Sequence, residues 1–157
     1  MILQRTGMVI VLVLVTGALV RVAYAQIAAI AIVQTGSLSF GSIVVGGMAG
    51  TVAVSPTGVR VAGGGVLLGN SGGAAPASFT VSGEPNTNYS IVLPASAALS
   101  GPDQDMTFDD FTTSPDGSGN LGPGGSQTVS VGATLHVNAN QGHGAYAGSL
   151  SVTVTYE

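Results

Sequence analysis

Carboxylates and imidazoles are the side chains of this sequence that could do chemistry, and they are few. Four aspartates, Asp103, Asp105, Asp109 and Asp110, fall within eight residues. Oxygen ligands at such close spacing are typical of calcium sites, but the fixed glycine and the distal glutamate of a calcium loop are missing. We therefore interpret the four carboxylates as solvated loop groups, and the sequence leaves open whether Asp103–Asp110 binds calcium.

The two histidines do not complete a recognisable catalytic site. His136 lies on the Ser/Thr side of an alternating run, and His143 lies in the turn 141–144. Serines are plentiful, but no Gly-x-Ser-x-Gly elbow falls on a strand-to-helix turn, and a catalytic triad is defined by its geometry. The glycine clusters at 63–65 and 122–125 lack the lysine and the following helix of a phosphate loop. The sequence predicts no enzyme and no cofactor.

Composition excludes further classes of protein. The chain of 157 residues has 25 glycines, three basic residues, no cysteine and no tryptophan, and only 6% of its residues are charged. Such a chain cannot build the basic surface that a nucleic-acid binder needs. Without cysteine, thiolate chemistry and structural zinc are excluded. A hydrophobic fraction of 45% is enough to form a core, so we expect one small domain.

The first 25 residues have the pattern of a secretory signal peptide. Arg5 precedes the apolar run 8–20, and the small-x-small sequence Ala23-Tyr24-Ala25 follows. The run is shorter than the roughly 20 residues that span a bilayer. We expect cleavage after Ala25 and export through the inner membrane, by way of the periplasm, to the cell surface. The mature chain would then have no membrane segment.

After residue 25 the sequence has the pattern of short β-strands separated by turns. Apolar and polar residues alternate in 79–82, 89–93, 129–137 and 150–156, and Gly, Pro, Ser and Asn lie between such runs. Alternation at period two means that each strand buries one face and exposes the other. About eight such strands predict an all-β fold, an antiparallel β-sandwich over residues 37–157.

Two glycine-rich segments are expected to be loops. Residues 63–76 and 114–125 are rich in Gly, Ser and Pro, with few apolar side chains that could enter a core. Loops at the ends of a sandwich are mobile and tolerate change. We therefore expect neither segment to hold a site.

The segment 26–36 is unusual for a terminus, because seven consecutive apolar residues, 27–33, lie near its start. A loose apolar run would promote aggregation. The run must therefore be covered, either as an edge strand of its own sandwich or as a strand added to another molecule. In an extended strand, alternate side chains form two rows, one on each face, and here both rows are apolar. The sequence therefore does not determine which row is buried. One row is Ala28, Ile30 and Ile32, and the other is Ile27, Ala29, Ala31 and Val33.

Several stretches carry a resemblance to known proteins. Leu-x-Phe-Gly-x-Ile occupies 38–43, and a closing segment runs from 132 to 141 and on through 144–148 to 152–156. Together with 79–83 and 89–94, these stretches resemble a family of secreted bacterial domains that is described only as a domain of unknown function. That family is similar in turn to pilin subunits of the chaperone–usher pathway, especially those of its archaic branch.

The similarity to pilins rests on the C-terminus. Tyr156 is penultimate, Leu150, Val152 and Val154 alternate before it, and Gly144 is the fourteenth residue from the end. The resemblance implies an immunoglobulin-like sandwich that lacks its last strand. A periplasmic chaperone would lend a strand until the N-terminal segment of the next subunit replaces it. The same C-terminal pattern is also that of a hairpin leading into an ordinary sandwich strand.

The resemblance implies a structural subunit of an extracellular pilus or fimbrial filament, with a role in cell adhesion or biofilm. Its partners would be copies of itself, the periplasmic chaperone and an outer-membrane usher. The donor-strand candidates are Ala28, Ile30 and Ile32, and the candidates for contact with the chaperone are Gly144, Leu150, Val152, Val154 and Tyr156. The alternative is a self-contained secreted or outer-surface sandwich, a binding or coat protein in which 27–33 forms its own edge strand.

Overall fold

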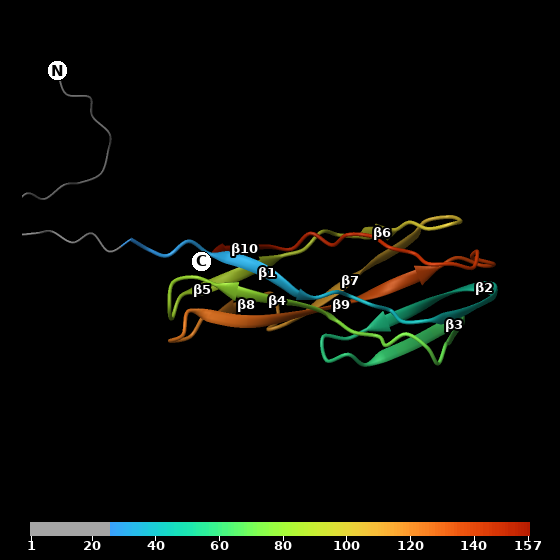
Figure 1. Ribbon diagram of the computed structural model, residues 1–157, viewed down its shortest axis with the longest axis horizontal. Coiled ribbons are helices and arrows are strands. Elements are labelled where there is room, and N and C mark those ends of the chain that lie inside the picture. Colours follow the sequence, from blue (N-terminus) through green and yellow to red (C-terminus); the bar gives the residue numbers. More distant parts are fainter. Residues whose placement is uncertain (1–25) are drawn as a thin grey trace, which may run out of the picture.

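The computed structural model describes residues 26–157, so the expected signal peptide lies outside the described residues. Within this range the chain forms ten strands and no helix, and hence no helix that is long and apolar enough to cross a membrane. The predicted all-β fold is confirmed (Figure 1). The strands are β1 (Ala31–Gly36), β2 (Ile43–Val54), β3 (Arg60–Leu68), β4 (Ala77–Ser82), β5 (Asn88–Val92), β6 (Ala97–Leu99), β7 (Met106–Ser114), β8 (Ser118–Asn120), β9 (Ser126–Val137) and β10 (Thr153–Tyr156).

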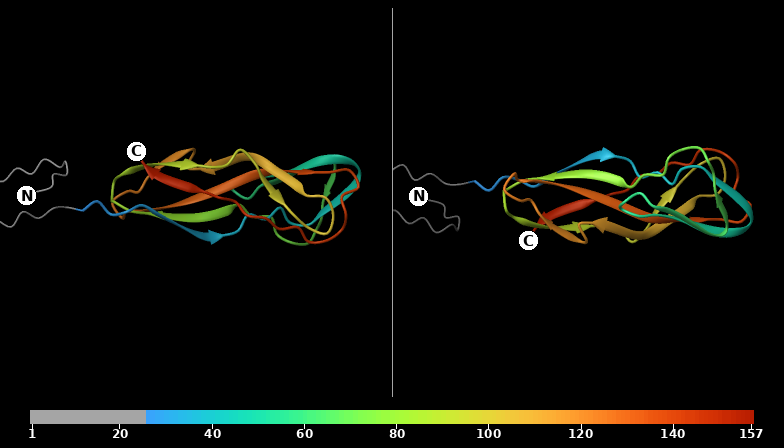
Figure 2. Two further views of the ribbon diagram at one scale, coloured as in Figure 1. Left: turned by 90° about the horizontal axis from the view of Figure 1, so that it is seen from above. Right: turned by 90° about the horizontal axis from the view of Figure 1, so that it is seen from below.

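The strands form two antiparallel sheets. The larger has the order β1-β4-β9-β2-β3, and the smaller has the order β10-β5-β8. Strand β9 is the centre of the larger sheet, because its Leu135 pairs with Val52 of β2 on one side and with Phe108 of β7 on the other. Strand β6 extends the sheet beyond β7. Figure 2 shows the elongated sandwich from above and below, with β1 and β10 belonging to different sheets.

Local sequence explains where these strands run and turn. Along β9, buried and more exposed residues alternate from Val129 to Val137, except at Gly132, which is buried between Val131 and Ala133. The turn between β2 and β3 has Pro56 at its second position, and its closing amide, on Gly58, donates to the Ser55 carbonyl over 2.9 Å. Gly58 has φ 83°, a conformation that glycine adopts without steric cost.

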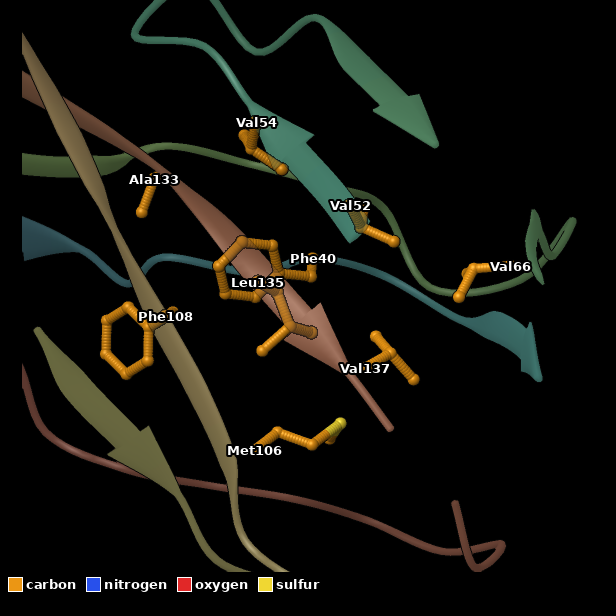
Figure 3. Close-up of a cluster of buried hydrophobic side chains, with 9 residues drawn as sticks. All are labelled: Phe40, Val52, Val54, Val66, Met106, Phe108, Ala133, Leu135 and Val137. Atoms are coloured by element: carbon orange, nitrogen blue, oxygen red, sulfur yellow. The ribbon is translucent and has the colours of Figure 1, made fainter. Parts of the chain in front are cut away.

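The core consists of two clusters of buried side chains, one toward each end of the sandwich. Figure 3 shows the first cluster, in which Phe40 and Phe108 meet edge to face with 6.1 Å between ring centroids. The second surrounds Tyr89, whose hydroxyl donates to Gln127 over 2.7 Å. Burial raises the pKa of the Tyr89 phenol. Three half-buried residues pack against both clusters, namely Leu38, Phe111 and Leu150.

The glycine-rich segment 114–125 is more ordered than the sequence predicts. It contains β8, which pairs with β5, and Leu121, which is 1% exposed in the second core cluster. The expectation of a simple loop is wrong here because one leucine reaches the core while the glycines around it form the turns. Residues 63–76 are likewise a loop only in part, since β3 continues to Leu68.

Candidate functional site

An open groove with an apolar floor and partly polar rims lies between the chain that follows β1 and the chain that leads into β10. Its first rim is residues 37–43 and its second rim is residues 144–150, and it has a volume of about 790 Å³. Figure 2 (left) shows the second rim, in red, running toward β10. Side chains of the core line the groove, among them Phe79, Leu99, Met106, Phe108 and Leu135.

The two rims have backbone groups without partners. On the first rim, Ser39 exchanges two hydrogen bonds with Ala75, at 2.8 and 2.9 Å. Neighbouring residues of an extended chain direct their backbone groups to opposite sides, so those of Leu38 face the groove. On the second rim Ala147 pairs with Ser100, and within the described chain residues 148–152 make no backbone hydrogen bond. The backbone groups without partners are therefore those of residues 148–152 on the second rim and of Leu38 on the first, where the carbonyls of Phe40 and Ser42 are bonded to Arg60.

Arg60, the single cation of residues 26–157, holds the first rim in place. Its Nη1 donates to the carbonyls of Phe40 (2.9 Å) and Ser42 (3.0 Å), and its Nη2 donates to the carbonyl of Gly69 (2.9 Å). Gly41 has φ 68°, and a Cβ at this position would collide with the guanidinium. The planar fork of arginine suits several acceptors at once, so Arg60 fixes the shape of the rim.

Arg60→Met is expected to loosen the first rim and to lower the free energy of unfolding by about 2–3 kcal/mol, because hydrogen bonds from a charged donor are lost together. Arg60→Lys keeps the charge but not the fork, and its loss should be intermediate. Urea denaturation of the three proteins measures both effects. Equal stability of wild type and Arg60→Met would show that water replaces the guanidinium at no cost.

The N-terminal segment, residues 26–36, lies on its own sandwich. Its strand β1 pairs with β4, from Ala31 opposite Ser82 to Gly36 opposite Ser78. The donor-strand candidates Ile30 and Ile32 are half-buried against the second core cluster. The third candidate, Ala28, is exposed. The opposite row faces solvent, with Ile27 73% and Val33 60% exposed.

The C-terminal candidates divide between the groove and the core. Gly144 and Leu150 line the groove. Val154 is buried in β10, while Val152 and Tyr156 are half-buried against the same cluster. The strand ladder with β5 begins only at Thr153, so the part of the predicted strand from 150 to 152 lacks a neighbour in the described chain.

Tyr156 and Glu84 together bind the backbone of Ala28. The Tyr156 hydroxyl donates to the Ala28 carbonyl over 2.5 Å and accepts from the Glu84 amide over 2.7 Å. The Ala28 amide in turn donates to Oε2 of Glu84 over 2.9 Å. Three hydrogen bonds thus close a ring that joins the N-terminal segment, the turn after β4 and the last strand.

The carboxylates and histidines lie on the outside of the sandwich. Asp109 on β7 contacts His136 on β9, with 2.6 Å between Oδ1 and Nε2, and both side chains are partly exposed. Asp110 lies beside them, so these three residues could together offer ligands to a metal ion. Asp103 instead accepts a hydrogen bond from the Gly142 amide over 2.7 Å. The structure thus separates Asp103 from the Asp109–Asp110 pair.

Sequence reasoning missed Arg60 and Glu84. A signal was present for Arg60, because a single cation in an otherwise uncharged, strand-rich stretch must find acceptors. No signal identified Glu84, since its role depends on three segments that are far apart in sequence.

The comparisons with known proteins give one family. The profile described as Domain of unknown function (DUF4402) matches residues 30–156, nearly all of the described chain. The comparisons with curated proteins and with solved structures gave no match. The matched range begins within the N-terminal segment and includes both rims of the groove.

Proposed function

We propose that this chain, which belongs to the DUF4402 family of domains of unknown function, is a structural subunit of an extracellular pilus or fimbrial filament. In this proposal, subunits are joined by donor-strand exchange. A periplasmic chaperone and an outer-membrane usher assist assembly, and the filament serves cell adhesion or biofilm formation. The observation that supports the proposal best is the groove with an apolar floor, whose two rims have backbone groups without partners.

A groove of this construction suits a β-strand. Insertion of an extended chain would satisfy the backbone groups of Leu38 and of residues 148–152, which is the physical basis of β-strand addition. Alternate side chains of the inserted strand would contact the apolar lining, including Met106 and Phe108. A purely apolar ligand would fill the volume but leave the backbone groups without partners.

The N-terminal segment of a second copy has the composition that the groove requires. Its residues 27–33 are all apolar, and eleven extended residues, 26–36, span about 36 Å at roughly 3.3 Å per residue. A rim of seven residues spans about 23 Å by the same rule. The segment is therefore long enough to cover the groove. To be donated, it must first leave the β4 strand of its own subunit.

One observation favours the alternative, a self-contained secreted or outer-surface binding or coat protein. The N-terminal segment already covers part of the core of its own sandwich, because β1 pairs with β4 and both Ile30 and Ile32 are half-buried. In that case the N-terminal segment never leaves, and the groove serves another ligand. The two functions differ in whether the groove accepts the segment.

Binding of a synthetic peptide with the sequence of residues 26–36 tests the proposal. Protein purified from cells that express the full chain is mixed with the peptide, and hydrogen exchange of residues 144–152 is followed by mass spectrometry. We expect slower exchange there, because the peptide backbone would bond to the second rim.

The matched control is the same peptide with Asp at the positions of Ile30 and Ile32, which should give no protection because two carboxylates would face the apolar floor of the groove. Unchanged exchange with the natural peptide at about 1 mM, a concentration that detects even weak binding, would contradict the proposal and favour the self-contained sandwich.

A further inference from the structure

We propose that Tyr156 and Glu84 form a latch that holds the N-terminal segment on its own subunit and controls its release. The inference rests on the proposed function, in which that segment is donated to a neighbour. The latch consists of Ala28, Glu84 and Tyr156, joined by the ring of three hydrogen bonds described above.

The latch grips backbone rather than side chain. Both the amide and the carbonyl of Ala28 are bound, the first by the Glu84 carboxylate and the second by the Tyr156 hydroxyl. Ala28 lies three residues before β1 and has an exposed side chain. Without these bonds, the segment before Ala31 would be held only by the partial burial of Ile30.

The surrounding chain is shaped to admit the latch. Gly83 precedes Glu84, and a Cβ on Gly83 would collide with the hydroxyl of Tyr156. The Gly83 amide is itself bonded to the Gly125 carbonyl over 2.9 Å, which fixes the turn that presents Glu84. The hydroxyl, the carboxylate and the turn are thus arranged around one peptide unit of the N-terminal segment.

The latch links the first strand of the sandwich to the last. Tyr156 lies on β10, which belongs to the smaller sheet, whereas the segment continues into β1 of the larger sheet. Release of the whole segment must break the latch as well as the β1–β4 ladder, because Ala28 lies on the same segment, three residues before that ladder begins. The latch therefore adds to the cost of releasing the segment and keeps an unassembled subunit closed.

Hydrogen exchange of residues 26–36 in Tyr156→Phe tests the latch. The substitution removes the hydroxyl and keeps the ring, and we expect local opening of the segment to increase by roughly five- to tenfold, which corresponds to about 1–1.4 kcal/mol. Glu84→Gln should give a smaller increase, because its amide oxygen can still accept. Exchange in β9, which opens only with the whole domain, should rise by no more than the same factor and stay far slower than exchange in the segment.

Two further variants keep the test specific. Thr155→Val removes the hydroxyl of an exposed neighbour that bonds only to Ser90, and it should leave the segment unchanged. Gly83→Ala displaces the Tyr156 hydroxyl without altering any latch residue, and it should reproduce the effect of Tyr156→Phe. Exchange of residues 26–36 at the wild-type rate in both Tyr156→Phe and Gly83→Ala would overturn the latch.

The outcome is independent of the test of the proposed function. Tyr156→Phe leaves both rims of the groove intact, so the peptide of residues 26–36 should protect residues 144–152 in the variant as it does in the wild type. Faster opening of the segment together with peptide binding supports a latch that controls donation. If the segment opens faster in Tyr156→Phe but the peptide binds neither the variant nor the wild type, the latch does not control donation. The ring of hydrogen bonds would then be only a structural contact.

Discussion

Val154→Asp is expected to abolish recovery of soluble, folded protein, whereas Thr153→Asp leaves the sandwich folded. Val154 is 8% exposed and belongs to the second core cluster, while Thr153 is exposed on the opposite face of β10. The substitution loses roughly 1.5–3 kcal/mol of apolar burial and adds the larger cost of placing a carboxylate among Phe79, Val81 and their neighbours. A domain of this size is stable by only about 5–15 kcal/mol. Soluble yield and circular dichroism of both variants measure the difference.

Thr153→Asp is the control because it places the same charge one residue away. Thr153 pairs with Val92, which is 55% exposed, so the carboxylate remains in water. Similar yields of folded protein from the two variants would mean that β10 does not bury the face that contains Val154. The assignment of this strand to the core would then be wrong.

The strands could be predicted from the sequence where one face of the strand is buried and the other is exposed to solvent. In β4 and β9, apolar residues such as Phe79 and Val131 alternate with Ser and Thr. An apolar residue at every second position is typical of a β-strand, because successive side chains of a strand point to opposite faces. The signal fails in β8, which is three residues long and lies among glycines. It is also absent from 27–33, where both rows are apolar, so that only packing against β4 decides that Ile32 faces inward and Val33 outward.

The groove could not be predicted from the sequence, for a different reason. Alternation in 150–156 indicates which side chains share a face, but not whether a neighbouring strand exists. In the structure Thr153–Tyr156 has β5 as its partner, while 148–152 has none within the described chain. A gap between strands is a property of how distant segments meet. The same holds for the latch, where Ala28 and Tyr156 are separated by 128 positions.

Filament formation should be lost when Ile30 and Ile32 are both changed to Asp in the full chain. In the donated segment these side chains would point to the apolar floor of the next subunit's groove, where carboxylates would lose their hydration without gaining a partner. On their own subunit they are only half-buried at the sheet edge, so the monomer should stay folded, as circular dichroism would verify. Polymer ladders on a denaturing gel without heating, together with electron microscopy, measure the loss.

Val33→Asp is the control that separates two effects of the double variant. One is that the segment no longer fits the groove, and the other is that the segment carries added negative charge. Val33 is 60% exposed and belongs to the opposite row, so in the donated strand its carboxylate would face water and filaments should persist. If Val33→Asp alone abolished the ladders while the double variant kept them, the row Ile27, Ala29, Ala31 and Val33 would be the one that fills the groove. Ladders at wild-type level in all of these variants would remove donor-strand exchange as an account of the groove, because no register of an Asp-bearing strand can bury its charges among Met106, Phe108 and Leu135.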